Sequence, residues 1–515
     1  MCFFSILYET PEDKPVVECS IQPDFFSDLN LDQIVSRIVD GSEEYQLEPF
    51  FYQPLTSISA IRYRQEVLQD LQSMELLEHM TAFSQGMRKV HEYLQFSCDV
   101  HNQHQRRKWL LDAACLYCEV LQSLKQYLAQ SEYASKGLKL FYSWLSGYIQ
   151  SEAFALLEAE TTAVLQEFDS IHYAIEVETN KVSILPDLSQ MDFTAELLRT
   201  FESFSSPVCD DEIHLFSNLE MCVLETKMAE ILMKMHPKSF EHLELFAARH
   251  NGFLHEAVSV FERELQFYLS ILSYISDLEK KGFQFCIPHF AQGKQLKVTC
   301  GYDLSLAGKV QHADAVIAND YELTGSERIF VLSGPNQGGK TTFARAFGQT
   351  LFLAGLGCPV PARSAELFLS DRFFTHFSRE ENPEANTGRL KDDIVRMKAI
   401  LKQCTSSSML IINELFSSTT SLDAYTMGKR VLEAFLAKDC VVLYITHIHE
   451  LAEISPETVS MTAQVDEAES AVKRTYHIRR QRPDGRAYAN TIAEKYHLTY
   501  QEIKERIKHE GSFAI

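Results

Sequence analysis

The stretch of sequence that decides the fold reads Gly334-Pro335-Asn336-Gln337-Gly338-Gly339-Lys340-Thr341. It fits the pattern G-x-x-x-x-G-K-[ST], in which a glycine-rich turn joins a buried strand to a helix. An apolar run over residues 329–332 precedes the turn, and a helical pattern over residues 342–353 follows it. Inward-pointing backbone N–H groups and the positive end of the helix suit such a turn to a phosphate group. We therefore predict a nucleotide-binding P-loop rather than a glycine turn with an incidental lysine.

The residues of this loop have distinct expected roles. Lys340 is expected to reach the β and γ phosphate oxygens, and Thr341 to bind Mg²⁺ through its hydroxyl group. The predicted nucleotide contacts are Gly334, Pro335, Asn336, Gln337, Gly338, Gly339, Lys340, Thr341 and Thr342. The predicted cofactors are accordingly ATP and Mg²⁺.

Two further apolar runs end in polar residues, Asn413-Glu414 and Thr446-His447. Because parallel strands end at the same edge of a sheet, both ends should border the phosphate site. Glu414 is the predicted general base. His447 is predicted to sense the γ-phosphate or to orient water, the alternative being a loop histidine with satisfied hydrogen bonds. Asn413 stands where P-loop enzymes hold Mg²⁺ through its water shell, so we expect a metal contact there. The predicted catalytic residues are therefore Lys340, Glu414 and His447.

The N-terminal half of the chain has a different pattern. From about residue 31 to residue 281 apolar residues recur at three- and four-residue spacing, which predicts helices, with a break at His236-Pro237. The last helix is expected over residues 253–281. Alternating Ile, Val and Tyr over residues 172–185 predict a small β-hairpin. From residue 296 onward short strands alternate with helices, which predicts an α/β domain with a mainly parallel sheet.

Composition limits the classes of function. The chain has 515 residues, enough for roughly three structural units. Its formal net charge of -23 excludes a surface coated with cations, so any DNA contact must be local. The leading candidate contact is the run Arg106-Arg107-Lys108, although a solvated helix face explains the same run. Cys115 and Cys118 lack the partners that would complete a zinc site, so we expect buried helix cysteines there.

Targeting signals are not evident in the sequence. The apolar residues 1–7 lack a basic region, and Glu9, Glu12 and Asp13 follow them at once. No uncharged run approaches the length of a membrane span. With its scattered cysteines, the chain is therefore expected to be cytoplasmic and to have no membrane contact.

Taken together, these motifs resemble those of the MutS family of DNA mismatch-repair ATPases. The resemblance rests on Gly334-Pro335-Asn336 with Gly338-Gly339-Lys340, on Leu356-Gly357-Cys358-Pro359-Val360-Pro361-Ala362, on Asn413-Glu414-Leu415, and on Thr446-His447-Ile448-His449-Glu450-Leu451. It implies a helical core and lever region, an ABC-type ATPase domain and a dimer that acts on DNA. A looser likeness over residues 475–493 implies a C-terminal dimerisation tail.

The sequence also departs from the family pattern. The helical core starts near residue 50, which leaves no room for the family's mismatch-reading and connector domains, so classical mismatch recognition is not expected. Gly388 stands where the family has the serine that begins its signature helix, with Arg389 beside it. The resemblance implies that Gly388 and Arg389 of one subunit face the γ-phosphate bound by the other. Asn413 replaces an expected aspartate, which implies slow hydrolysis.

We therefore predict a multidomain chain, with a mainly α-helical core and lever region followed by an α/β P-loop ATPase domain. The predicted boundaries are 1–45 for an N-terminal segment, 46–290 for the helical region, 291–475 for the ATPase domain and 476–515 for the tail. The predicted function is a homodimeric DNA-binding ATPase that couples hydrolysis to clamping of DNA in repair or recombination. The alternative is a slow or inactive ATP-binding scaffold that clamps a protein partner.

Overall fold

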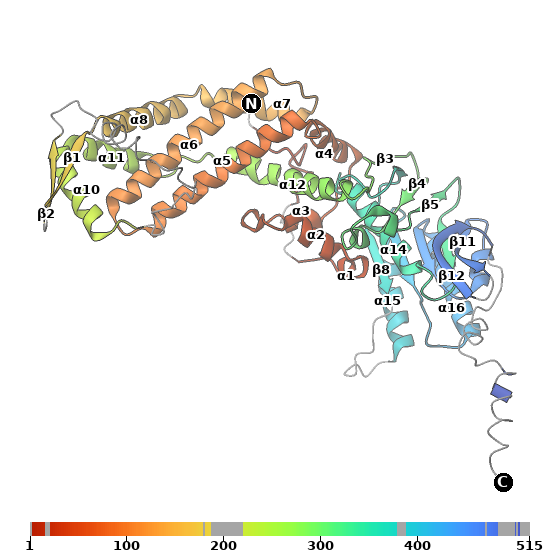
Figure 1. The fold of residues 1–515 in the computed structure, drawn as a ribbon. Coiled ribbons are helices and arrows are strands. Elements are labelled where there is room, and N and C mark those ends of the chain that lie inside the picture. Colours follow the sequence, from red (N-terminus) through yellow and green to blue (C-terminus); the bar gives the residue numbers. More distant parts are fainter. Residues whose placement is uncertain are drawn as a thin grey trace, which may run out of the picture. The chain divides into compact units, whose positions relative to one another are not determined.

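A computed structural model describes residues 3–15, 21–178, 181–186, 220–377, 388–468, 471–482, 500 and 503–504. The chain forms two compact units that interleave along the sequence (Figure 1). The helical unit comprises Met1–Phe3, Ser73–Ala134 and Leu138–Leu265, and the sheet unit comprises Phe4–Gln72, Ser135–Gly137 and Gln266–Ile515. Within the described ranges, no helix is both long enough and apolar enough to cross a membrane. The four-part linear division proposed from the sequence stays a prediction.

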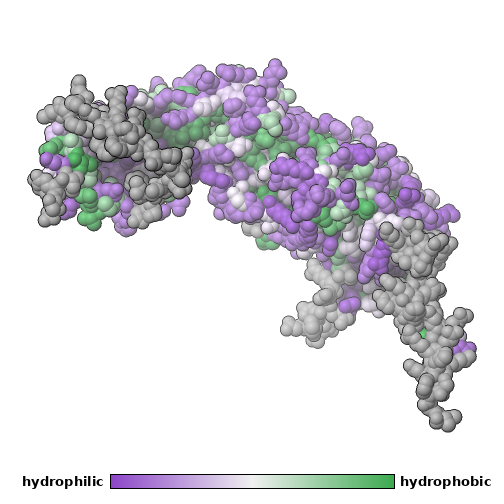
Figure 2. All heavy atoms as spheres, viewed as in Figure 1, coloured by the Kyte–Doolittle hydropathy of each residue, from purple (hydrophilic) through white to green (hydrophobic). Residues whose placement is uncertain are grey.

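The helical unit consists of long amphipathic helices and one hairpin. Its elements are α5 (Met74–Asp99), α6 (Gln103–Gln130), most of α7 (Lys136–Ile149), α8 (Glu152–Asp169), β1 (Tyr173–Glu178), β2 (Lys181–Pro186), α10 (Val223–Met235), α11 (Pro237–Arg249) and the first part of α12 (Glu256–Glu279). Helices α5 and α6 lie side by side. Hydrophilic side chains cover most of the face seen in Figure 2, as expected for helices that bury one stripe only.

Local sequence explains where these helices begin and end. The side chain of Asn102 accepts hydrogen bonds from the backbone N–H groups of His104 and Gln105, which caps the start of α6. Helix α10 ends before Pro237, whose ring fits only the first turn of the next helix. The expected break at His236-Pro237 is therefore confirmed.

The hairpin expected over residues 172–185 is present. Strands β1 and β2 pair antiparallel, from Tyr173 opposite Pro186 to Glu178 opposite Lys181. The turn itself, with Asn180, lies outside the described residues. The alternating pattern was sufficient to predict this element because successive side chains of a strand point to opposite faces.

The sheet unit contains two sheets. The larger comprises β6 (Ile329–Ser333), β8 (Phe373–Phe377), β9 (Met409–Asn413), β10 (Val441–Ile445), β11 (Thr458–Ala468) and β12 (Ala471–Arg480). Its order is β12-β11-β6-β10-β9-β8, and all neighbours are parallel except the β11–β12 pair. The smaller sheet has the order β3-β7-β4-β5, from β3 (His289–Phe290), β4 (Leu296–Gly301), β5 (Asn319–Leu323) and β7 (Ser364–Leu367). The expected α/β part with a mainly parallel sheet is thus confirmed.

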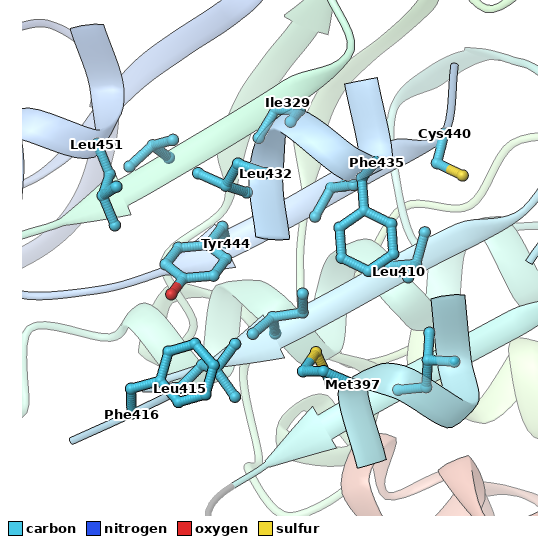
Figure 3. Close-up of a cluster of buried hydrophobic side chains, with 14 of the residues drawn as sticks. Ile329, Met397, Leu410, Leu415, Phe416, Leu432, Phe435, Cys440, Tyr444 and Leu451 are labelled. Atoms are coloured by element: carbon cyan, nitrogen blue, oxygen red, sulfur yellow. The ribbon is translucent and has the colours of Figure 1, made fainter. Parts of the chain in front are cut away.

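Helices cover both faces of the larger sheet. On one face, Leu410 and Tyr444 share a buried apolar cluster with residues of α15 (Arg389–Gln403) and α16 (Ser421–Ala437), including Phe435 (Figure 3). On the other face, the ring of Phe330 lies 6.0 Å from that of Phe347 in α14 (Lys340–Gly355). Strands buried on both sides read as continuous apolar runs, which is why their positions could be predicted.

The N-terminal segment packs onto α14. Helix α1 (Phe25–Leu29) places the rings of Phe25 and Phe26 5.4 and 5.3 Å from that of Phe352. Phe25 also contacts Phe373 of β8. Full burial of an aromatic side chain stabilises a fold by about 1.5–3 kcal/mol, so α1 is an integral part of the sheet unit.

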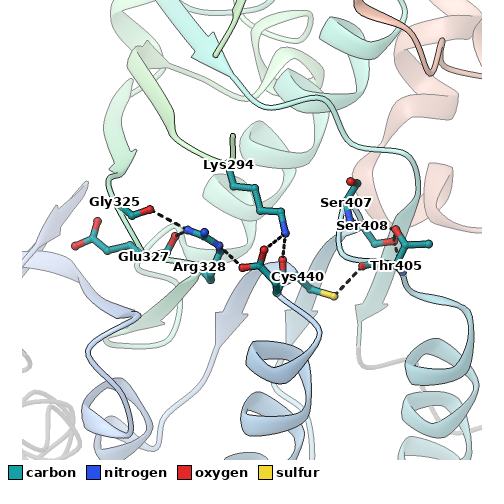
Figure 4. Close-up of polar contacts among 9 residues, drawn as sticks. Lys294, Gly325, Glu327, Arg328, Thr405, Ser407, Ser408 and Cys440 are labelled. Carbon is teal, nitrogen blue, oxygen red and sulfur yellow. Dashed lines mark hydrogen bonds and ion pairs between the residues drawn. The ribbon is translucent and has the colours of Figure 1, made fainter. Parts of the chain in front are cut away.

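Charged groups fix the edge of the sheet where β6 and β10 begin (Figure 4). Arg328 Nε donates to the Asp439 carboxylate at 2.6 Å, and Lys294 contacts the same group. Burial raises the pKa of Asp439, but the hydrogen bonds from the two cations outweigh it and hold that pKa below its ordinary value. Cys440, beside them, donates to the carbonyl oxygen of Thr405 at 3.1 Å.

One ion pair, in which only the carboxylate is buried, should give the helical unit a pH-dependent stability. His91 Nε2 of α5 lies 2.9 Å from the Glu262 carboxylate of α12, and this contact raises the pKa of His91 above 6.5. A histidine whose pKa is raised by folding stabilises the fold fully below its unfolded value and loses that effect as pH rises through the folded value. His91→Gln should therefore lower the free energy of unfolding by about 1 kcal/mol at low pH. This value is reduced for solvent screening because the imidazole is 44% exposed.

The measurement is urea unfolding of wild type and His91→Gln at about pH 5.5 and about pH 9, on either side of the ordinary histidine pKa. The difference in free energy of unfolding should shrink toward zero at the higher pH. An equal difference at both pH values would contradict a charged His91–Glu262 contact.

Candidate functional site

The loop between β6 and α14 is built around two glycines. Gly339 has φ +89°, a left-handed conformation that side chains rarely adopt, and it caps the start of α14. A Cβ atom on Gly338 would lie 2.9 Å from the carbonyl oxygen of Pro335, closer than real contacts allow. The predicted strand–turn–helix arrangement around Gly334–Thr341 is therefore present, and its shape requires glycine.

Lys340 lies inside this loop. Its side chain extends along the turn, and its ammonium group donates to the carbonyl oxygens of Gly334 at 2.9 Å and Pro335 at 3.1 Å. The residue is only 5% exposed. Burial lowers the pKa of Lys340, and the charge of Glu414 partly opposes that shift. The loop thus holds a buried cation that any incoming anion would meet.

Strand register brings the other predicted groups to the same edge. Ile445 of β10 pairs with Leu332 of β6 on one side and with Asn413 of β9 on the other. The backbone N–H of Glu414 then donates to the carbonyl of Ile445 at 3.0 Å. Residues that follow these strands are therefore neighbours, as predicted from the parallel order.

Glu414 and His447 form a pair at this edge. His447 Nε2 lies 3.3 Å from Glu414 Oε1. The hydrogen bond from His447 lowers the pKa of Glu414, burial opposes this, and the charges of His447 and Lys340 lower it further. Glu414 is consequently a carboxylate at neutral pH and a weaker base than an unpaired glutamate.

A cavity of about 390 Å³ adjoins the loop. Seven of the predicted residues line it: Asn336, Gln337, Gly339, Lys340, Thr341, Thr342 and Glu414. Gly334, Pro335 and Gly338 shape the loop without lining the cavity, and His447 reaches it only through Glu414. Gly388 and Arg389, at the start of α15, do not line it.

Several residues that line the cavity were missing from the predicted site, among them Tyr476 and Asn319. Tyr476 of β12 lines the cavity beside Gly339, and Asn319 of β5 fixes it. The Asn319 amide oxygen accepts the N–H of Ile478 at 2.7 Å, and its amide nitrogen donates to the carbonyl of Tyr476 at 3.4 Å. The motif Thr475-Tyr476 was noted in the sequence, but the boundary at residue 475 assigned Tyr476 to the tail. Strand β12 instead continues to Arg480.

The fit of the site to a metal ion rests on oxygen donors. Asn413 is 8% exposed, and its Oδ1 has no hydrogen-bond partner in the described part of the chain. Thr341 offers a hydroxyl group in the first turn of α14. Among the described residues, no cluster of three or more His, Cys, Asp or Glu side chains is arranged to hold a metal. A hard dication such as Mg²⁺ fits here if phosphate and water complete its shell.

The sequence's other candidate sites have local partners. Arg107 pairs with Glu244 of α11 at 2.9 Å, Lys108 pairs with Asp112 of α6 itself, and Arg106 donates to the backbone carbonyls of Cys98 in α5 and Val100. Arg106 and Arg107 therefore tie α6 to α5 and α11, and the charges of the run are largely engaged. Burial raises the pKa of the Cys115 thiol to about 11 and that of Cys118 to about 12, so both thiols are protonated at neutral pH.

Comparison with known proteins gives one consistent family. Residues 330–509 match the family model of MutS domain V. The chain is 29% identical over 176 residues to the DNA mismatch repair protein MutS of Chlorobaculum tepidum, and 31% identical over 180 residues to that of Erythrobacter litoralis. These matches cover 33% and 35% of this chain and 20% of each relative. The protein of that name from Chlorobium phaeobacteroides is 26% identical over 286 residues, which is 55% of this chain and 30% of the relative.

The matched region contains most of the site. The loop, the ends of β9 and β10, and Tyr476 all lie within residues 330–509. The chain spans only between 20% and 30% of the length of these relatives, so the resemblance concerns one region of each.

Proposed function

With a MutS domain V over residues 330–509, the chain is a MutS-family protein, and from this premise we propose that its sheet unit binds ATP and hydrolyses it slowly. The observation that carries the proposal is the cavity lined by Lys340 and Thr341 from the loop and by Glu414 from the end of β9. The buried cation and the N–H groups of the loop suit a phosphate chain, and the carboxylate suits an attacking water.

Binding would follow from the contacts of the loop. The phosphates of ATP would replace the carbonyl oxygens of Gly334 and Pro335 as acceptors for Lys340. Thr341, and Asn413 through water, would hold Mg²⁺, which supplies charge neutralisation of the phosphates when bound. The ring of Tyr476, at the cavity wall, would offer a flat face to the adenine base.

Hydrolysis would rest on Glu414. A water molecule attacks the γ-phosphorus, the bond from that phosphorus to the β–γ bridging oxygen breaks, and Glu414 takes the water's proton. ADP and phosphate are the products. His447, which keeps Glu414 ionised, also makes it a weaker base. A slow turnover is therefore expected even before the missing charge at Asn413 is considered.

DNA is the proposed partner because the relatives' printed name is DNA mismatch repair protein. Closing and opening of a dimer on DNA would be the output of hydrolysis. The second candidate, an ATP-binding scaffold for a protein partner, is favoured by the net charge of -23 and by the engaged charges of Arg106-Arg107-Lys108.

The experiment that separates the two candidates is a gel-shift panel of duplex, mismatched, forked and four-way DNA, with and without ATP, at several salt concentrations. Salt-dependent binding together with DNA-stimulated turnover would support the DNA-acting enzyme. Absence of binding to every member of the panel, alongside intact ATP binding, would favour the scaffold.

A first variant tests the nucleotide site. Lys340→Ala removes the only cation that lines the cavity among the described residues, so ATP affinity should fall by about a hundredfold or more. The fold should remain intact, as judged by circular dichroism. Lys402→Ala, an exposed lysine of the same unit, is the matched control. Undiminished ATP affinity in Lys340→Ala would refute the site.

A second variant tests a site shared between two subunits. We propose that Gly388 and Arg389, at the N-terminal end of α15, face the γ-phosphate bound by a second copy, because a helix start and a cation suit an anion. Light scattering of Glu414→Ala with ATP and Mg²⁺ should give a dimer. Adding Arg389→Glu should weaken that dimer by about tenfold, since it places an anion against the phosphate. A strictly monomeric protein would refute this arrangement.

A third variant tests the metal contact. Asn413→Asp introduces a negative charge at the proposed metal contact, so the Mg²⁺ concentration for half-maximal turnover should fall by roughly tenfold and turnover should rise. The assay is ATP hydrolysis across a Mg²⁺ titration, with Glu414→Ala as the inactive control. If neither quantity changes, Asn413 is not the residue that limits the reaction.

A further inference from the structure

Asp393 of α15, which has no role in the proposed reaction so far, connects β8 to the turn that follows β9. One of its carboxylate oxygens accepts the backbone N–H of Phe416 at 3.3 Å. The other lies 3.1 Å from Nε2 of His376, at the end of β8. The carboxylate is 19% exposed and the imidazole 5%, so both contacts are largely shielded from water. A shielded hydrogen bond to a carboxylate holds its partner more firmly than an exposed one.

The backbone that Asp393 holds is a strained turn. Glu414 has φ +57° and Phe416 has φ +62°, both left-handed conformations that non-glycine residues seldom adopt. Such a conformation persists only where the surroundings enforce it. The side chains of Leu415 and Phe416 are anchored in the core of the sheet unit (Figure 3), and the N–H of Phe416 is anchored by Asp393.

The same turn begins with the predicted base. Glu414 leaves β9 at this point, and its carboxylate faces the cavity, Lys340 and His447. A small rotation of the turn would move that carboxylate relative to an attacking water. Misplacement of a reacting group by about 1 Å can lower a rate by about a hundredfold.

Helix α15 is itself fixed one turn further on. Arg396 donates to the carbonyl of Thr375 in β8 at 2.8 Å and lies 3.7 Å from the carboxylate of Asp28 in α1. The hydroxyl of Thr375 donates to the same carboxylate at 2.6 Å. Asp393 therefore projects from a helix that is held against β8, and it can transmit that fixed position to the turn.

We propose that Asp393 is a positioning residue for ATP hydrolysis, which sets the direction of the Glu414 carboxylate by holding the turn at Phe416. The inference rests on the proposed function. It assigns Asp393 no contact with nucleotide, because Asp393 does not line the cavity. It also gives the start of α15 a mechanical connection to the catalytic turn, so movement at Gly388 and Arg389 reaches Glu414 through one carboxylate.

Three variants of Asp393 separate geometry from charge. Asp393→Ala removes the acceptor and should lower kcat for ATP by about tenfold to a hundredfold, with nucleotide affinity within about twofold of wild type. Asp393→Asn has the same shape and keeps one oxygen for the Phe416 N–H, so kcat should stay within about threefold. Asp393→Glu keeps the charge but shifts the oxygens by one methylene, and should lose about tenfold in kcat. Asp392→Ala, an exposed neighbour, is the control.

The measurements are steady-state ATP turnover, equilibrium nucleotide binding and thermal unfolding. A loss of kcat in Asp393→Ala and Asp393→Glu, with unchanged affinity and rescue by Asp393→Asn, is the expected result. The inference would be overturned, while the proposed function would stand, if kcat were unchanged in both Asp393→Ala and Asp393→Glu. A parallel loss of nucleotide affinity and thermal stability would also overturn it, because Asp393 would then have a purely structural role. If Asp393→Ala does not fold, Asp393→Glu decides by the same criteria. If wild type and Asp392→Ala bind no ATP, the proposed function fails and the inference fails with it.

Discussion

The sheet unit depends on one constraint, the parallel register of β6, β10 and β9. Because Leu332, Ile445 and Asn413 lie side by side in that register, everything that follows these residues emerges at one edge. A slip of one residue would turn the apolar side chains of a strand to the wrong face. Burial of the strands on both faces, against α14 on one side and against α15 and α16 on the other, makes such a slip costly. The packing of the core therefore brings the residues of the site to the same edge of the sheet.

Local sequence patterns predicted most of the elements. The positions of two elements, α1 and β12, depend instead on contacts with residues far away in the sequence. The loop at Gly334–Thr341, the strands beside it and the hairpin after residue 172 are encoded by spacing within a few residues, and all were predicted. The packing of Phe25 onto Phe352 and the place of Tyr476 in the sheet depend on partners far away in sequence. No periodicity within α1 indicates that partner, and a strand that pairs antiparallel at the edge of a parallel sheet looks like the beginning of a separate tail.

Three electrostatic features of the site fit the proposed slow hydrolysis of ATP. Lys340 is the buried cation of the loop, and its pKa is lowered by burial. The carboxylate opposite it has a lowered pKa because His447 donates a hydrogen bond, so it stays charged but accepts a proton reluctantly. At the proposed metal contact, the amide oxygen of Asn413 has no hydrogen-bond partner among the described residues and carries no negative charge. Under the proposed function, these three features act in the same direction, toward slow hydrolysis of ATP.

The docking of α1 on α14 also bears on how the chain is made. Ribosomes add roughly 5–20 residues per second, so the aromatic side chains of Phe25 and Phe26 leave the exit tunnel roughly tens of seconds before Phe352 and Phe373 exist. During that interval the apolar surface of α1 has no packing partner, because the helical unit is synthesised before α14. The sheet unit can close only after translation has passed β9 and β10, and contacts of such long sequence separation form slowly. Nascent chains of this protein should therefore bind chaperones that shield early apolar segments, and the order of synthesis places the last folding step in the sheet unit.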